Sequence, residues 1–243
     1  MIHYHGSPIS GEMIEAVKFF SKRSALISFS KPTQIQVISQ VCRSFVLDNG
    51  SYSFFNSGKP INWNDFYEFV ETWKNHPRFD WFIVPDVIDG TEEENDNLLL
   101  SNPYPRYISV PVWHIGSEPL ARLDRLINEF PRIAIGTSGN LILKSMNWWN
   151  EMRKAFEVVC NSDGIPKVKI HGLKMLDPEI VNGFPFSSCD SAGAVILSSF
   201  DKDWQFPYAP LQKSARASLY ADYIENAQSP SFYKFKPIQL DLL

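Results

Sequence analysis

Cysteine is scarce in this chain of 243 residues, and the three that occur, Cys42, Cys160 and Cys189, include no C-x-x-C pair. That pattern excludes a zinc knuckle and a disulfide framework. No apolar run approaches the roughly 18 residues that a membrane span needs. The opening residues, MIHYHGSPISGEM, lack the basic and apolar parts of a signal peptide. We therefore expect a cytoplasmic protein with reduced thiols and no association with a membrane.

A large excess of charge of one sign is also absent, since the formal net charge is −4. This balance counts against a strongly non-specific nucleic-acid binder. The charges are nevertheless unevenly distributed. Residues 60–100 contain two basic and ten acidic side chains, whereas residues 121–174 contain nine basic and five acidic ones. Either one side of the molecule is basic, or these charges form the ordinary solvated faces of helices.

Eight short apolar runs recur along the chain, and each ends in a polar residue or glycine before a loop. Their apolar character is continuous rather than alternating, which is typical of parallel strands that are buried on both faces. The runs cover residues 2–5, 25–29, 44–48, 81–86, 108–114, 132–136, 167–171 and 186–190.

Segments with helical periodicity follow these runs, at 12–23, 33–43, 63–75, 93–100, 118–130, 145–160, 177–182 and 192–199. Asn62 and Thr91 are the expected N-caps of two of them. The eightfold alternation predicts an α/β fold, a single (β/α)8 barrel over about residues 1–200. A doubly wound open sheet is the alternative. Residues 201–243 are expected to form a C-terminal extension with a helix near 209–227, so that residues 1–243 make one domain.

Three of the predicted strands end at or near an aspartate: Asp48, Asp86 and Asp190. In a barrel, catalytic groups project from the carboxyl ends of the strands. A single aspartate at such a position is as readily explained as the cap of the next helix. Three such caps are a poorer explanation, because each aspartate lies in a short segment of small or proline residues. We therefore expect one carboxylate-lined active site.

Carboxylates grouped in this way suit chemistry at the anomeric carbon of a sugar. One attacks or stabilises an oxocarbenium-like centre, and another, with a raised pKa, handles the proton of the leaving group. Histidines at other strand ends suggest a metal site as the alternative. Its ligands would be drawn from His3, His5, His114, His171 and an aspartate.

The ordered motifs LDNGSYSF, IVPDVIDG, PVWHIG, IAIGTSG, IHGLKML and FSSCDSA, between about residues 45 and 192, resemble the tRNA-guanine transglycosylase superfamily. They look most similar to the compact phage and bacterial members that act on DNA, the DNA 7-deazaguanine transglycosylases. The resemblance implies a barrel that needs no organic cofactor, in a bacterial or phage-infected cell. It also implies exchange of guanine for a 7-deazaguanine, such as 7-cyano-7-deazaguanine, through a covalent aspartyl-glycosyl intermediate.

The resemblance gives each aspartate a role. Asp190 matches the family's nucleophile, Asp48 its general acid and base, and Asp86 the carboxylate that reads the guanine-like edge. Tyr52 matches the aromatic residue that stacks on the purine. The other motif positions expected to bind substrate are Asn49, Ser53, His114, Gly116, Gly136 and His171.

The motifs also depart from the family's pattern. Ser51 replaces a glycine, and Ser53 and His114 replace glutamines, which leaves the identity of the base open. The zinc subdomain of tRNA-acting members is missing, which favours DNA or a free nucleoside over tRNA. We expect phosphate contacts from basic helix faces between Arg122 and Lys174. A protein partner or a homodimer would add the DNA binding that an acidic chain lacks.

Three other functions suit the same residues. The first is a nucleoside or nucleic-acid N-glycosidase, in which water replaces the incoming base. The second is a metal-dependent barrel hydrolase that uses the histidines. The third is a non-catalytic barrel that binds a nucleobase or nucleic acid.

Overall fold

The computed structural model describes residues 1–138, 141–197 and 206–235. Its centre is one sheet whose paired strands all run parallel. The strands are β1 (Ile2–Gly6), β2 (Ser24–Ser28), β3 (Phe45–Asp48), β4 (Phe79–Ile83), β5 (Ser109–Val110), β6 (Val112–Ile115), β7 (Arg132–Thr137), β8 (Lys169–Gly172) and β9 (Ser188–Ser191). They neighbour one another in the order β5-β4-β3-β2-β1-β9-β8-β7-β6.

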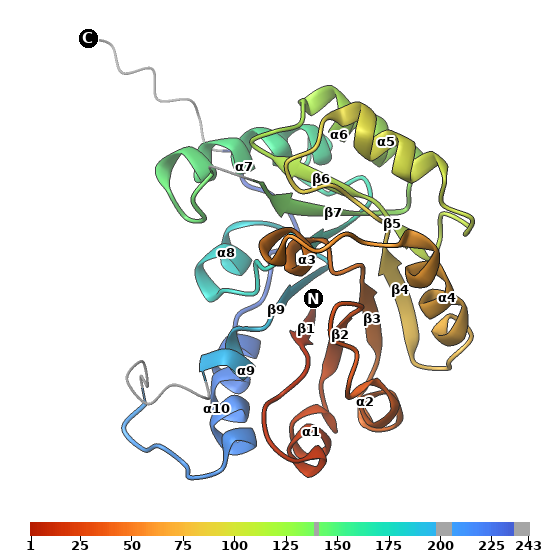
Figure 1. The fold of residues 1–243 in the computed structure, drawn as a ribbon. Helices are drawn as coiled ribbons and strands as arrows, with labels where there is room; N and C mark the ends of the chain where they lie inside the picture. The colour runs from red at the N-terminus through yellow and green to blue at the C-terminus, as the bar shows by residue number, and fades with distance from the viewer. Residues whose placement is uncertain (139–140, 198–205, 236–243) are drawn as a thin grey trace.

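The two outer strands of that order, β5 and β6, are separated in the chain by Pro111 alone. Proline has no N–H to donate, so the ladder breaks there and the fifth predicted strand is observed in two pieces. β5 pairs with β4, and β6 pairs with β7. The sheet therefore returns on itself as the wall of a nearly closed barrel with helices around it (Figure 1). This confirms the predicted (β/α)8 architecture over an open sheet.

A helix follows each strand of the barrel, as predicted. The helices are α1 (Met13–Phe20), α2 (Ile35–Val41), α4 (Trp63–Trp73), α5 (Glu92–Leu100), α6 (Leu120–Glu129), α7 (Met146–Val159), α8 (Pro178–Gly183) and α9 (Gly193–Leu197). Asn62 caps α4, and Thr91 forms a capping box with Glu94 at the start of α5. The last two residues of the helix predicted at 192–199 lie outside the described residues. Within the described chain, no helix is both long and apolar enough to cross a bilayer.

One additional helix, α3 (Ser51–Ser57), lies between β3 and α4 where the sequence suggests a short loop. Two glycines with left-handed backbone define it. Gly50, at φ +80°, precedes it and passes so close to Ser30 that a Cβ would lie 3.0 Å from the Ser30 nitrogen. Gly58, at φ +64°, ends it, and its N–H bonds to the last turn. Only Asn49 and Gly50 thus separate Asp48 from the start of this helix.

Alternation of side chains along each strand separates the barrel interior from the layer beneath the helices. The interior is packed by Tyr4, Leu26, Val46, Trp81, Ile83, Val110, Val112 and Ala134. Where one of these side chains faces the interior, the side chain two positions later in the same strand faces it too. Val46 is followed in this way by Asp48, and Val112 by His114, so both polar groups enter the barrel at its carboxyl end.

The same alternation turns His3 and His5 outward, because Tyr4 between them is in the interior. His5 is fully buried and its Nε2 lies 2.8 Å from Glu225 Oε1, while His3 Nε2 lies 3.1 Å from the Ala227 carbonyl. The expectation that His5 projects into the barrel mouth is therefore wrong. Both histidines attach the C-terminal segment to the barrel wall.

That segment contains α10 (Lys213–Glu225), close to the helix predicted near 209–227. It lies against α1 and α9 on the outside of the barrel (Figure 1). Arg23, which precedes β2, forms ion pairs with Asp222 and Glu225 of this helix. Further on, the ring of Tyr233 stacks on Phe184. The described part of the predicted extension, residues 206–235, therefore packs against the barrel, and residues 201–205 and 236–243 lie outside the described residues.

Candidate active site

Asp48, Asp86 and Asp190 meet at the carboxyl end of the barrel. Asp48 is the last residue of β3, Asp190 lies in β9, and Asp86 follows β4 by three residues. Their charges act on one another, since both Asp190 and Asp86 raise the pKa of Asp48. All three also act on the ammonium of Lys174. The predicted convergence of the three strand ends is thus present in the geometry.

Asp48 has the environment of a proton-transferring acid. Burial raises its pKa to about 6, and the charges of Asp190 and Asp86 add to that effect. Hydrogen bonds oppose it: Ser28 donates to the carboxylate, and the Gly50 N–H lies 3.1 Å from Oδ2. A carboxyl group with this pKa exchanges protons readily near neutral pH.

Asp86 is nearly buried and each of its oxygens accepts one hydrogen bond from a side chain. Asn49 Nδ2 donates to Oδ1 at 2.6 Å, and His114 Nε2 lies 2.8 Å from Oδ2. Asn49 also donates to the Val84 carbonyl, and Ser51 donates to the Asp86 carbonyl. These contacts fix the carboxylate and leave further lone pairs on it free to accept from a ligand.

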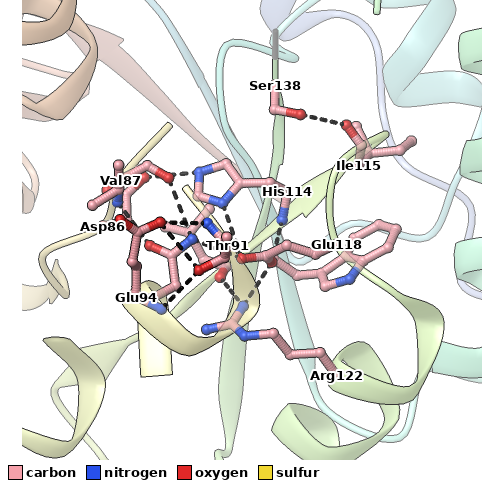
Figure 2. A network of polar contacts seen from close by, with 12 residues as sticks. Asp86, Val87, Thr91, Glu94, His114, Ile115, Glu118, Arg122 and Ser138 are labelled. Atoms are coloured by element: carbon pink, nitrogen blue, oxygen red, sulfur yellow. Dashed lines mark hydrogen bonds and ion pairs between the residues drawn. The ribbon is translucent and has the colours of Figure 1, made fainter. Parts of the chain in front are cut away.

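Behind His114 lies a second buried carboxylate, that of Glu118 (Figure 2). Glu118 Oε2 accepts from the His114 backbone N–H at 2.8 Å and from Arg122 Nη1 at 2.7 Å. Its Oε1 lies 3.5 Å from His114 Nδ1 and accepts from Asn95. Burial lowers the pKa of His114, but the hydrogen bonds and charges of Asp86 and Glu118 outweigh it and raise the pKa to about 9. His114 is therefore an imidazolium held between two carboxylates at neutral pH.

Asp190 is held by the loop after β8 and by the histidine beneath it. The Lys174 N–H donates to Oδ1 at 3.0 Å, and His171 Nε2 lies 3.2 Å from the same oxygen. His171 has no exposed surface, and its ring packs edge-on against Trp81 and Tyr4. Burial lowers the pKa of His171, so it is neutral there. It supports Asp190 from within the barrel.

Lys174 is the residue of this site that the sequence did not reveal. Its ammonium lies over the ring of Tyr52, and its backbone is left-handed, at φ +56°. Non-glycine residues in that conformation are uncommon and concentrate at functional sites. Burial lowers the pKa of Lys174 to about 8, against the opposing charges of Asp190, Asp48 and Asp86. The only sequence signal was its place in IHGLKML after a barrel strand.

Of the remaining residues predicted to bind substrate, Gly136 lies inside the barrel, whereas Gly116 and Ser53 are exposed. Gly136 faces the interior, where a Cβ would meet Val112, Leu173 and His114 at 3.3 to 3.7 Å, so it leaves room beside His114. Gly116 is exposed and faces Leu141 instead. Ser53 is exposed on α3. Among the described residues, no hydrogen bond joins the Ser53 side chain to the aspartates.

The four histidines proposed as metal ligands do not converge. His3 and His5 lie outside the barrel, whereas His114 and His171 lie inside it beside Asp86 and Asp190. Nowhere in residues 1–138, 141–197 or 206–235 do three or more His, Cys, Asp or Glu side chains form a group that could hold a metal ion. The particular ligand set drawn from the sequence is therefore wrong.

Four of the nine basic residues between Arg122 and Lys174 form ion pairs within the described part of the protein. Arg122 is buried against Glu118 and Asp96, and Arg125 pairs with Glu92 and Asp96. Lys144 and Lys154 also form ion pairs with carboxylates. Arg122 therefore cannot contact phosphate as expected, and a nucleic acid would have to bind through other residues.

Searches with protein-family models, among curated proteins and among solved structures found no match to this chain. The resemblance to transglycosylases stays a prediction from the motifs. The barrel, and the three aspartates at its carboxyl end with their hydrogen-bond partners, are accordingly the evidence on which a function rests.

Proposed function

We propose that the protein is a base-exchange transglycosylase that replaces guanine in nucleic acid, most simply DNA, with a 7-deazaguanine. The observation that carries this proposal is the division of three neighbouring carboxylates into different environments. Asp48 has a pKa near neutrality, Asp86 is fixed by an imidazolium and an amide, and Asp190 is fixed by a backbone N–H. Each environment suits one step of exchange at an anomeric carbon.

Asp190 is the nucleophile in this proposal. Its oxygen forms a bond to C1′ of the target nucleotide as the bond from C1′ to the guanine nitrogen breaks, and the electron pair of that bond leaves with the base. The Lys174 N–H and His171 both contact Oδ1, so Oδ2 is the oxygen left for attack. The product is a covalent glycosyl ester of Asp190.

Asp48 moves the proton. Its carboxyl group protonates the departing guanine, because a pKa of about 6 leaves a useful protonated fraction near neutral pH. The resulting carboxylate then takes a proton from the incoming 7-deazaguanine. The nitrogen freed of its proton attacks C1′ and breaks the ester bond to Asp190, which restores both carboxyl groups.

Asp86 selects the base. An ionised carboxylate accepts hydrogen bonds and donates none, which suits the ring N–H and exocyclic amine of guanine and its 7-deaza analogues. The same edge of adenine presents an unprotonated ring nitrogen and is rejected. The His114 imidazolium donates to Asp86 and fixes the orientation of its carboxylate. Tyr52 supplies an aromatic face for the base on the side of its ring that the Lys174 ammonium does not cover.

The proposed chemistry requires the target nucleotide to leave a base-paired stack, because the aspartates lie within the mouth of a barrel. Single-stranded DNA avoids the cost of unpairing. The residues described account for attack, proton transfer and base recognition, so we assign the reaction no cofactor.

The test is incubation of the protein with single-stranded guanine-containing DNA and labelled 7-cyano-7-deazaguanine. We expect label in the DNA, and at least a thousandfold less with Asp190→Ala or Asp48→Ala. Asp163→Asn, a change of an exposed carboxylate on another loop, is the matched control and should leave the rate unchanged. Release of guanine without incorporation would point to the N-glycosidase instead. Failure of a folded sample to label DNA or tRNA would reject base exchange.

A further inference from the structure

The surface of α3 combines exposed aromatic rings with a local excess of positive charge. Tyr52 and Phe55 are three positions apart on the helix and therefore share a face. Their side chains are 50% and 53% exposed. Phe54, between them, turns the other way and packs against Phe29. The helix is thus anchored by one ring and presents two others to solvent at the barrel mouth.

Two lysines at this end of the barrel lie beside the helix. Between residues 24 and 64 the acidic residue is Asp48, and the basic residues at this end are Lys31 and Lys59, since Arg43 lies with Lys22 at the opposite end. Lys31 and Lys59 are exposed on the loops that follow β2 and α3, and Lys174 reaches Tyr52 from the β8 loop. Among the described residues, none of these three lysines lies within ion-pair distance of a carboxylate. Lys144, on the loop after β7, instead pairs with Asp177 and Glu179.

Aromatic faces between lysines form the usual platform for single-stranded nucleic acid, since bases stack on the rings while the ammonium groups contact phosphates. A phosphate backbone also complements the charge of this surface, which a neutral or basic protein partner would not. The platform adjoins the site, because only Asn49 and Gly50 separate α3 from Asp48.

We propose that α3, with Lys31 and Lys59 beside it, binds the unpaired nucleotides next to the target nucleotide. A base neighbouring the target stacks on Phe55, and Lys31 and Lys59 contact phosphates on either side of it. This inference rests on the proposed function for the identity of the target. It names a surface that binds the strand in place of Arg122 and Arg125 of α6, which are paired with carboxylates within the protein.

The test measures binding of a fluorescein-labelled 12-nucleotide single-stranded DNA by anisotropy, at several salt concentrations. We expect Phe55→Ala and Lys59→Glu each to weaken binding about tenfold. Lys31→Glu and Lys59→Glu should each lower the salt dependence, the slope of log K against log salt, by about one. Lys22→Glu and Phe232→Ala are matched controls, because both are exposed at the opposite end of the barrel. Thermal melts confirm that the variants are folded.

Two results would overturn the inference. One is wild-type affinity for the DNA in both Phe55→Ala and Lys59→Glu. The other is that the wild-type protein does not bind single-stranded DNA and instead binds a protein partner through α3. Base exchange is measured separately on the same samples. Exchange with an unchanged KM for DNA in Phe55→Ala rejects the platform and leaves the proposed function standing. DNA binding that depends on Phe55, without any exchange, supports the platform and rejects the proposed function.

Discussion

The ammonium of Lys174 lies over the ring of Tyr52, although the two residues follow strands on opposite sides of the barrel. β3 and β8 are separated by three strands in either direction around the wall, counting β5 and β6 as one. The contact therefore bridges the full width of the mouth, directly above the three aspartates. The ammonium in that position interacts with the charges of all three aspartates.

Replacing Lys174 with methionine should move the pH dependence of exchange upward. Because Lys174 and Asp48 interact, loss of the ammonium makes ionisation of Asp48 harder and raises its pKa above about 6. Asp48 must be protonated to release guanine, so kcat/KM for DNA falls as pH rises through that pKa. We expect this fall in kcat/KM to shift by about half a pH unit to higher pH.

The control for that change is Lys174→Arg, which keeps the charge and should keep the wild-type profile. A purely structural role for Lys174 would lower the rate equally at all pH values. If the fall of kcat/KM with rising pH stays in place or moves to lower pH in Lys174→Met, the electrostatic role is contradicted.

Asp48→Asn should stabilise the protein at high pH while it abolishes exchange. The pKa of Asp48 is higher in the folded state, about 6, than its ordinary value of 3.8. The folded state thus binds more protons between these values, and stability falls as pH rises through them. Ionised Asp48 therefore costs roughly 2–3 kcal/mol above pH 6. Urea unfolding at pH 8 should show a gain of about 2 kcal/mol in Asp48→Asn, which disappears near pH 4.

Asp163→Asn, at an exposed carboxylate, is the control for this comparison and should change stability by less than about 0.5 kcal/mol. Equal stabilities of Asp48→Asn and wild type at pH 8 would mean that Asp48 ionises without cost in the folded protein. The assignment of Asp48 as the proton carrier would then lose its physical basis.

His114→Gln should weaken both stability and base binding. The folded-state pKa of His114, about 9, exceeds its ordinary value of 6.5. Its contribution to stability is complete below pH 6.5 and is lost as pH rises through 9. Replacing it leaves the buried carboxylate of Asp86 without its cation, while Glu118 keeps only Arg122, and this should cost roughly 2–4 kcal/mol at pH 7.

The measurement is urea unfolding between pH 6 and 10, together with the affinity for free 7-cyano-7-deazaguanine. The free energy of unfolding of the wild type should fall across that range, and that of His114→Gln should fall less. The affinity of His114→Gln for the free base should be about tenfold lower than that of the wild type. A variant with the same decline as wild type would show that His114 is not the titrating group.

Much of this architecture could be predicted, because parallel strands buried on both faces have continuous apolar runs that the sequence displays directly. The inward direction of Asp48, Asp190 and His114 also follows from alternation once one interior residue of each strand is known. The outward direction of His5 does not follow from the sequence, because its run, IHYH, shows no apolar face, and only the packing of Tyr4 in the barrel interior reveals which way the histidines turn.

The rest depended on contacts between distant parts of the chain. The helix α3 escaped prediction since its seven residues are too few to show a period, and its ends depend on left-handed glycines. Apart from its position after a strand, nothing in the sequence indicates a role for Lys174 in the site, because its contact with Tyr52 crosses the barrel mouth. Glu118 resembled an ordinary first-turn residue of a helix. Its role depends on the burial of His114 and Arg122 beside it.

Glu225→Gln should destabilise the protein without changing exchange. Glu225 accepts from buried His5 and pairs with Arg23 on the outside of the barrel wall, whereas the aspartates face its interior. Loss of this charge should lower the free energy of unfolding by about 1–3 kcal/mol and leave kcat unchanged. Urea unfolding and exchange kinetics on one preparation measure both. A fall in kcat with unchanged stability would place His5 and Glu225 in the reaction instead of in the attachment of α10.

The most direct test of the account is detection of the covalent intermediate on Asp190. The protein is mixed with a guanine-containing single-stranded oligonucleotide, without incoming base, and quenched in acid. Digestion and mass spectrometry then locate any nucleotide adduct. We predict an adduct on the peptide that contains Asp190, absent in Asp190→Asn and still formed in Glu225→Gln. An adduct on any other residue, or exchange that proceeds in Asp190→Asn, would contradict the account.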